Sequence, residues 1–333
     1  MRRGVGAAFA AILLAGCGGT ASAPHSAAPA ATGRATPSTT SSSAAHAFRP
    51  TRARTARATW HLPFAVARAA LTEVAGDPRR TLLAGGMLPG DTSTDRVTEI
   101  DPRKGHTIPG PPLAIPVHDA AAGTFAGQPA VYGGGNSTEQ SAVQELLRGR
   151  WQRVGRLPTT RSDLSVATVR GRSIVVGGYD GASVPRSILA QHGRGLRPQG
   201  RLQHGVRYAA TAVVGQDIFV FGGEVDHREL GDVQRVDVRT GRTTVVARLP
   251  RPLGHAVAVY AGGRVLLMGG RIGLDRQTSA MWWFDPASHR FTPAGHLPVP
   301  LSDSAAVVLG RRIWLLGGED PRVTDRVVVV TLS

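Results

Sequence analysis

Six polar or ionisable residues recur along this 333-residue chain, each six positions after a leucine. The leucines are Leu62, Leu113, Leu157, Leu202, Leu249 and Leu297, and the residues that follow them are Arg68, Asp119, Asp163, Tyr208, His255 and Asp303. Carboxylates, an imidazole and a guanidinium in one place could perform acid–base chemistry on a sugar. Aspartates with a histidine could also bind a metal ion. No pair has a spacing that specifies either site, so we assign these residues to ligand binding and assign no catalytic residue and no metal ligand.

A second recurrence, a glycine pair directly after a short apolar run, indicates how these residues are positioned. The pairs begin at Gly85, Gly133, Gly177, Gly222, Gly269 and Gly317, at intervals of 48, 44, 45, 47 and 48 residues. A period of about 46 residues is typical of a propeller blade. In five of the six repeats the polar residue precedes the glycine pair by 14 positions. The pattern predicts six similar units with the polar residues at equivalent places.

The repeat from Leu202 to Leu249 shows what one unit contains. Four short strand-forming segments, 208–214, 218–221, 233–238 and 243–247, are separated by turn residues such as Gly215-Gln216 and Arg239-Thr240-Gly241. Such a series predicts an antiparallel meander. The glycine pairs precede polar loops and further strands, so a role in holding a phosphate at a helix start is not indicated.

The glycine pairs after apolar strands, together with later aromatics such as Trp151 and Phe291, resemble the kelch-repeat family. The resemblance covers roughly residues 55–333, and it implies an all-β, six-bladed β-propeller of the kelch type. Some family features are degraded, since the aromatic that follows the glycines appears only as Tyr179.

Two enzymes resemble this architecture and suggest an alternative function. Galactose oxidase is similar, but its copper site needs a cysteine-linked tyrosine, and Cys17 is the only cysteine here. We therefore expect no copper radical chemistry and no cofactor. The bacterial N-acetylneuraminate epimerase implies the alternative of a carbohydrate-active enzyme, epimerase-like or lyase-like, working in the same funnel.

The two ends of the repeat region predict how the ring closes. A Leu-Pro pair follows the fourth strand in several repeats, and Leu62-Pro63 follows residues 55–61 in the same way. The last repeat ends after its third strand, at Leu332. We expect residues 55–61 to supply the fourth strand of the last blade, within a propeller domain of residues 54–333. This pairing would remove an open sheet edge.

In a meander, the start of the first strand and the end of the second lie at one end of the blade. The six polar residues, which we call the mouth residues, therefore ring one end of the central channel. The loops after the glycine pairs add Glu224, Arg271 and Glu319 on the same face. A concave, mixed-charge funnel is the default position for a binding site. The same residues could instead cap strand ends, because aspartate in turns commonly does so.

The N-terminus indicates export and attachment to a membrane. Met1-Arg2-Arg3 and an apolar run from Val5 to Leu14 precede Leu14-Ala15-Gly16-Cys17, which resembles the bacterial lipobox. We expect a signal peptide over residues 1–16 and lipidation of Cys17. Residues 17–53 are rich in Ala, Ser, Thr and Pro, which predicts a disordered tether. The protein would be extracytoplasmic and lipid-anchored to the bacterial cell membrane.

The net charge of +16 does not by itself predict a nucleic-acid partner. Seven of the arginines, and no acidic residue, lie in residues 1–57, and Lys104 is the only lysine. No basic helix or nucleic-acid motif accompanies them, which favours a solvated, arginine-rich surface. We expect a monomeric, non-catalytic module that binds a protein or a cell-envelope glycan through its funnel.

Overall fold

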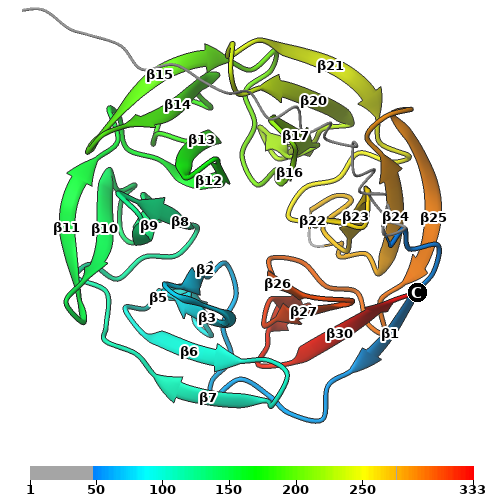
Figure 1. Cartoon of the computed structure of the whole chain (residues 1–333), viewed down its shortest axis with the longest axis horizontal. Coiled ribbons are helices and arrows are strands. Elements are labelled where there is room, and N and C mark those ends of the chain that lie inside the picture. The colour runs from blue at the N-terminus through cyan, green and yellow to red at the C-terminus, as the bar shows by residue number, and fades with distance from the viewer. Residues whose placement is uncertain (1–47, 275) are drawn as a thin grey trace, which may run out of the picture. The chain divides into compact units, whose positions relative to one another are not determined.

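The structure, a computed structural model, describes residues 48–274 and 276–333. These residues contain strands and turns, and none of them forms a helix long and apolar enough to cross a membrane. The expected signal peptide, Cys17 and most of the expected tether lie outside the described residues. Six four-stranded antiparallel sheets surround one axis, so the described part of the chain is a six-bladed β-propeller, as predicted (Figure 1).

The first three blades follow one another along the chain. The first contains β2 (Ala70–Val74), β3 (Asp77–Ala84), β6 (Val97–Asp101) and β7 (His106–Pro109). The second contains β8 (Ala121–Phe125), β9 (Gln128–Tyr132), β10 (Ala142–Leu147) and β11 (Arg150–Arg156). The third contains β12 (Ser162–Val169), β13 (Arg172–Tyr179), β14 (Ser187–His192) and β15 (Gly195–Arg201).

The remaining blades continue the same order. The fourth contains β16 (Ala210–Val214), β17 (Asp217–Phe221), β20 (Asp232–Asp237) and β21 (Thr243–Arg248). The fifth contains β22 (Val257–Ala261), β23 (Arg264–Met268), β24 (Ala280–Asp285) and β25 (Arg290–His296). The sixth contains β26 (Ala305–Leu309), β27 (Arg312–Leu316), β30 (Val327–Leu332) and β1 (Ala53–Arg57).

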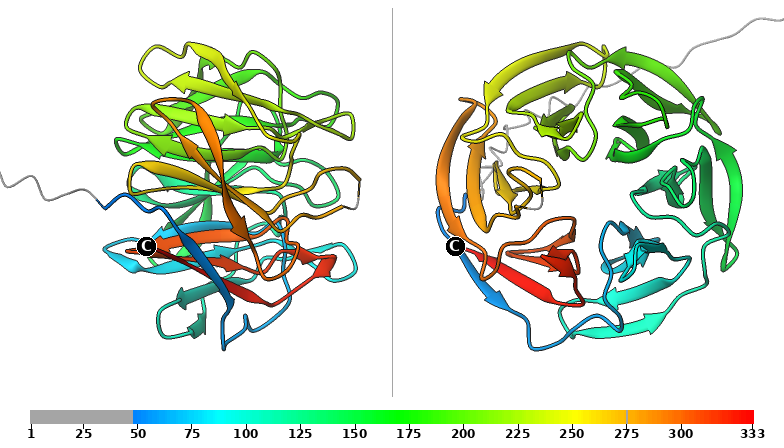
Figure 2. Two further views of the ribbon diagram at one scale, coloured as in Figure 1. Left: turned by 90° about the vertical axis from the view of Figure 1, so that its right-hand side faces the viewer. Right: turned by 180° about the vertical axis from the view of Figure 1, so that it is seen from behind.

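Three small hairpins extend the loops that follow the glycine pairs. They are β4 (Met87–Leu88) with β5 (Thr92–Ser93), β18 (Glu224–Val225) with β19 (Arg228–Glu229), and β28 (Glu319–Asp320) with β29 (Arg322–Val323). In every blade the strand that comes first after the inter-blade linker lies innermost, beside the central channel (Figures 1 and 2). All six linkers therefore reach the channel at the same end.

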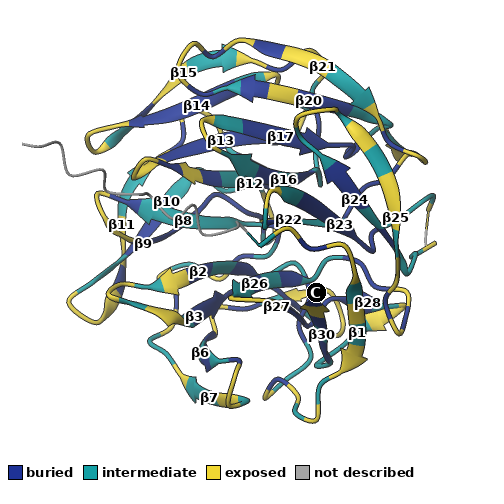
Figure 3. Ribbon diagram, turned by 45° about the vertical axis from the view of Figure 1, so that its right-hand side comes forward, coloured by how far each residue is buried: buried dark blue, intermediate teal, exposed yellow. Residues whose placement is uncertain are grey.

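Ring closure follows the prediction, with a shift of the closing strand. β1 pairs antiparallel with β30, from Ala53 opposite Leu332 to Arg57 opposite Val328. The expected segment, 55–61, began two residues too late and ended four residues too late. The reason is the length of β30, which begins at Val327 and offers no partner to residues beyond Ala58. The outer strands, β1 among them, carry many exposed residues, whereas the middle strands are mostly buried (Figure 3).

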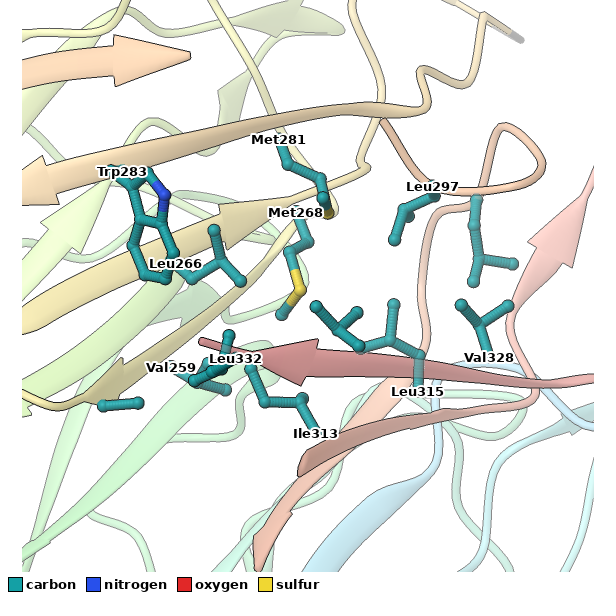
Figure 4. Close-up of a cluster of buried hydrophobic side chains, with 13 residues drawn as sticks. Val259, Leu266, Met268, Met281, Trp283, Leu297, Ile313, Leu315, Val328 and Leu332 are labelled. Carbon is teal, nitrogen blue, oxygen red and sulfur yellow. The ribbon is translucent and has the colours of Figure 1, made fainter. Parts of the chain in front are cut away.

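The apolar core of the described region is divided into six clusters, one between each pair of neighbouring blades. Between the fifth and sixth blades, Met268, Trp283 and Leu315 belong to one cluster (Figure 4). The neighbouring Leu267 and Trp282 pack on the other side, against the fourth blade. Alternate residues of a strand point to opposite faces, so each blade contributes to two clusters. Trp282 and Trp283 therefore enter different inter-blade spaces.

Candidate functional site

The glycine pairs wedge the end of each second strand against the next blade. A Cβ atom on Gly222, whose φ is +57°, would lie 2.1 Å from the carbonyl oxygen of Leu253 in the linker to the fifth blade. The first glycine of every pair shows the same close approach, at 2.1 to 2.5 Å. Only glycine combines a positive φ with so little space. The pairs therefore fix where each linker, and the mouth residue after it, meets the neighbouring blade.

Short backbone bridges bring the residue after each glycine pair beside the mouth. Arg207 pairs with Glu224, Gly254 with Arg271, and Ser302 with Glu319. Since the mouth residues Tyr208, His255 and Asp303 come directly after Arg207, Gly254 and Ser302, the three predicted loop residues lie next to them. The structure thus brings the predicted set of nine site residues to one end of the propeller.

The mouth residues form a closed ring of backbone hydrogen bonds. Each donates its N–H to the carbonyl oxygen of the mouth residue in the adjacent blade, at N···O distances of 2.8 to 3.1 Å. The order is Arg68 to Asp303, Asp303 to His255, His255 to Tyr208, Tyr208 to Asp163, Asp163 to Asp119 and Asp119 to Arg68. All six have left-handed backbone, with φ between 53° and 57°. This conformation turns each linker through the mouth before the innermost strand begins.

His255 is buried between two carboxylates. Its Nδ1 lies 2.7 Å from Asp303 Oδ1, and its Nε2 lies 3.2 Å from Glu224 Oε2. Burial lowers the pKa of His255, but the charge of Asp303 and the bonds to both carboxylates outweigh burial and raise it to about 9. The hydrogen bond from His255 lowers the pKa of Glu224, and His255 holds the pKa of Asp303 low despite burial. At neutral pH this group is an imidazolium between two carboxylates.

Two arginines complete the charge balance on this side of the mouth. Arg271 donates to Asp303 Oδ2 at 3.0 Å and also bonds Glu319. Arg68 donates to Glu319 Oε1 at 3.1 Å and to Asp119 Oδ2 at 3.3 Å. Burial and the neighbouring Asp303 raise the pKa of Glu319, although both arginines oppose this. The carboxylates here therefore already contact cationic side chains and are not free to bind a ligand.

On the other side, Tyr208 and Arg207 enclose Asp163. Arg207 pairs with Asp163 at 2.6 Å and bonds the hydroxyl of Tyr208, which donates to Asp119 Oδ2 at 3.3 Å. The ring of Tyr208 stacks on the His255 imidazole with centroids 3.9 Å apart. Burial, and then the charge of Asp119, raise the pKa of Asp163 to about 7, against the effect of Arg207. Burial likewise raises the pKa of Tyr208.

The space left inside the ring is small. The mouth residues and the small residues beside them line a cavity of 130 Å³, below the range of about 300 to 1,000 Å³ usual for small-molecule sites. Among the described residues, no group of three His, Cys, Asp or Glu is arranged to hold a metal ion. The cavity at the other end of the channel is larger, 520 Å³, but Glu73 is its only ionisable lining residue. The mouth residues therefore form a polar plug across the channel.

An apolar groove lies beside this plug, on the same end of the fifth blade. Its volume is 470 Å³, and its walls include Leu249, Leu253, Ile272 and Trp282. Leu274, two residues after the lining residue Ile272 in the loop after the fifth glycine pair, is 72% exposed. Large apolar side chains exposed beside a groove are typical of contact surfaces for other molecules.

Sequence reasoning missed several residues of this end. Arg207 pairs with Asp163, His118 approaches Asp119, and Arg207 also lies over the ring of Tyr179. Arg207 and His118 come immediately before a mouth residue, and Tyr179 comes immediately after a glycine pair. They could have been found by considering, in all six repeats, the position just before the mouth residue and the position just after the glycine pair.

Comparison with protein families gives one match at this place in the chain. Residues 252–298 match the family model described as Kelch motif. The matched segment contains all four strands of the fifth blade and its glycine pair, and the other five blades repeat that arrangement. The described part of the chain is therefore a six-bladed propeller, and its fifth blade matches the kelch motif. The kelch match therefore covers the blade that carries the apolar groove.

Proposed function

We propose that this kelch propeller is a binding module that uses its mouth end to hold a protein partner at the cell envelope. The observation that carries the proposal is the pairing of the ionisable mouth residues with one another. Asp303 contacts both His255 and Arg271, and Asp163 contacts Arg207. Charges that already satisfy each other offer little to a reacting substrate, but they build a rigid, polar platform.

The apolar groove supplies the contact energy that the platform lacks. Protein interfaces place aromatic and aliphatic side chains in a central pocket, surrounded by polar groups. Trp282 and Ile272 line such a pocket, with Arg251 and His296 at its border. This arrangement favours an apolar side chain of a protein partner. A glycan ligand and a sugar-modifying activity in the funnel are not supported by a comparable feature.

The test is capture of envelope proteins by the wild type and by two variants. Ile272→Asp with Leu274→Asp adds two negative charges at the groove and in its loop, and the control Val245→Asp with Tyr260→Asp adds the same two charges at other exposed apolar positions. We expect cross-linking and mass spectrometry to show a partner that the groove variant loses at least tenfold and the control retains. Equal retention by both variants would contradict the site, and recovery of envelope polysaccharide in place of protein would favour the glycan alternative.

We further propose that the module is attached to the membrane through a lipid on Cys17, after removal of residues 1–16. The lipobox-like Leu14-Ala15-Gly16-Cys17 supports this. Replacing Cys17 by Ser should release the protein from the membrane fraction, and continued sedimentation with membranes would contradict the anchor.

A further inference from the structure

The end of the propeller opposite the mouth, which we call the bottom face, carries a concentration of unpaired arginine. It is formed by the turns between the first and second strands and between the third and fourth strands of each blade. Eleven exposed arginines lie in or next to these turns and form no ion pair with a described carboxylate: Arg52, Arg103, Arg148, Arg150, Arg170, Arg172, Arg239, Arg242, Arg290, Arg311 and Arg312. They come from all six blades, so the charge is spread over the whole face.

The acidic residues in the turns of the bottom face are fewer than these arginines, and several of them hold the turns. Asp101 accepts the backbone N–H of Arg103, and Asp237 accepts those of Arg239 and Thr240. Asp285 accepts two turn N–H groups and also pairs with Arg49. These carboxylates are half-buried against their own turns, while the arginines extend into solvent.

The mouth end has a different balance of charge. Exposed arginines such as Arg156, Arg201 and Arg228 lie there too, but acidic residues accompany them in the loops, among them Asp91, Asp95 and Asp226. The net positive charge of the propeller is therefore concentrated at one end. This asymmetry produces a directed electric field, which a uniformly arginine-rich surface would not.

The chain also enters the propeller at the bottom face. Phe48 and Pro50 pack on Gly262, in the turn between the first two strands of the fifth blade. The guanidinium of Arg311, in the corresponding turn of the sixth blade, lies 4.3 Å from the centre of the Phe48 ring. Whatever precedes Phe48 is thus joined to the propeller at the basic end, opposite the mouth.

We propose that the bottom face docks on an anionic lipid bilayer. Anionic headgroups attract arginine by about 1 kcal/mol for each residue near the surface, within roughly a Debye length. Guanidinium groups also bind phosphate through paired donors, which suits phospholipid headgroups. Docking in this orientation holds the mouth end away from the membrane, where a partner can reach it. The contact is independent of the proposed partner and of the proposed lipid on Cys17.

The test is sedimentation of the full-length, unlipidated chain with phosphatidylcholine vesicles that contain or lack phosphatidylglycerol. The bottom variant carries Arg148→Gln, Arg150→Gln, Arg170→Gln and Arg312→Gln, which are exposed side chains without a described hydrogen bond. The matched control carries Arg156→Gln, Arg201→Gln, Arg228→Gln and Arg322→Gln, which lie at the mouth end. Both keep the same N-terminal segment, so any membrane affinity of that segment cancels in the comparison.

We expect the wild type and the control to bind phosphatidylglycerol vesicles, and the bottom variant to bind them at least about tenfold more weakly. Wild-type binding should also weaken steeply as salt is added. Equal loss in both variants, or binding that does not depend on phosphatidylglycerol, would overturn the proposal. Equally tight binding to duplex DNA, lost in the same variant, would also overturn it by showing a surface for any polyanion. If the bottom variant does not fold, the double variant Arg148→Gln with Arg170→Gln replaces it and should still bind phosphatidylglycerol vesicles more weakly than the control.

Discussion

The left-handed backbone of the mouth residues is an unusual requirement for side chains other than glycine. It costs about 1 to 2 kcal/mol for each such residue, and one backbone hydrogen bond returns about 0.5 to 1.5 kcal/mol. Aspartate and histidine tolerate this conformation better than most residues, which fits Asp119, Asp163, His255 and Asp303. Tyr208 and Arg68 adopt it as well, with φ of 54° and 55°. The cost of the left-handed backbone and the gain from the ring of backbone hydrogen bonds nearly cancel. The side-chain pairs therefore determine how stable the mouth is.

His255 should make the stability of the propeller depend on pH. Its pKa is about 9 in the folded chain, against a value of 6.5 without these contacts. The protonated histidine thus contributes its full stabilisation below about pH 6.5, and this contribution is lost as the pH rises to about 9. We expect the free energy of unfolding to fall across this window in the wild type, and to fall less in His255→Gln. Urea unfolding at several pH values measures both, and parallel profiles would contradict the assignment.

The sequence was sufficient to place the mouth residues but not to show how they interact. Fixed spacings from Leu202 and Gly222 placed Tyr208 at the mouth, because position within a repeat determines position within a blade. The stacking of Tyr208 on His255, and the pair between Arg207 and Asp163, join different repeats. Such contacts depend on rotamers and on the angle between blades, which no spacing within one repeat encodes.

At the scale of the elements, each blade is held by the end of its second strand. The carbonyl oxygen of Leu253, in the linker to the next blade, lies so close to Gly222 that no methyl group fits there. The repeated apolar run and glycine pair predicted this strand end correctly in five of the six repeats, whereas β13 of the third continues through its glycine pair to Tyr179. The boundaries of β1 were not predicted correctly, because an outer strand with few apolar residues takes its length from its partner.

A comparison of Gly222 with Gly215 separates the effect of the close contact with the fifth blade from the effect of backbone strain. Both have positive φ, +57° and +63°, but a Cβ on Gly215 would have nothing within 4 Å. We expect Gly215→Ala to lower the free energy of unfolding by about 1 kcal/mol, and Gly222→Ala to lower it by at least about 3 kcal/mol more. Chemical denaturation of the two variants measures this. Similar losses would show that the close contact with the fifth blade carries little weight.

At the scale of the whole molecule, the propeller is a closed ring whose two ends differ. The mouth end is polar, nearly balanced in charge and bordered by the apolar groove, whereas the bottom face is basic. β1 completes the ring through five paired residues with β30. Closure covers the edge of β30 and gives the sixth blade a fourth, outer strand like that of the other five blades.

Closure by β1 predicts the effect of two truncations. A chain that begins at Phe48 keeps every contact of β1, whereas a chain that begins at Ala58 lacks the strand. We expect the shorter chain to melt at least about 10 °C lower, and a peptide of residues 48–58 added in excess to restore part of the loss. Calorimetry of both chains, with and without peptide, measures this. Equal melting temperatures would mean that β1 is dispensable for closure.

The direction of β1 determines how the protein would respond to a mechanical load. β1 runs from the bottom face towards the mouth, and the chain continues from its lower end towards the N-terminus. A pull on that N-terminal segment, resisted by a partner at the mouth, would act along the strand and load its bonds to β30 together in shear. Strands sheared lengthwise resist force better than strands peeled apart one bond at a time. The same strand that closes the ring is therefore oriented to keep a tethered propeller folded under tension.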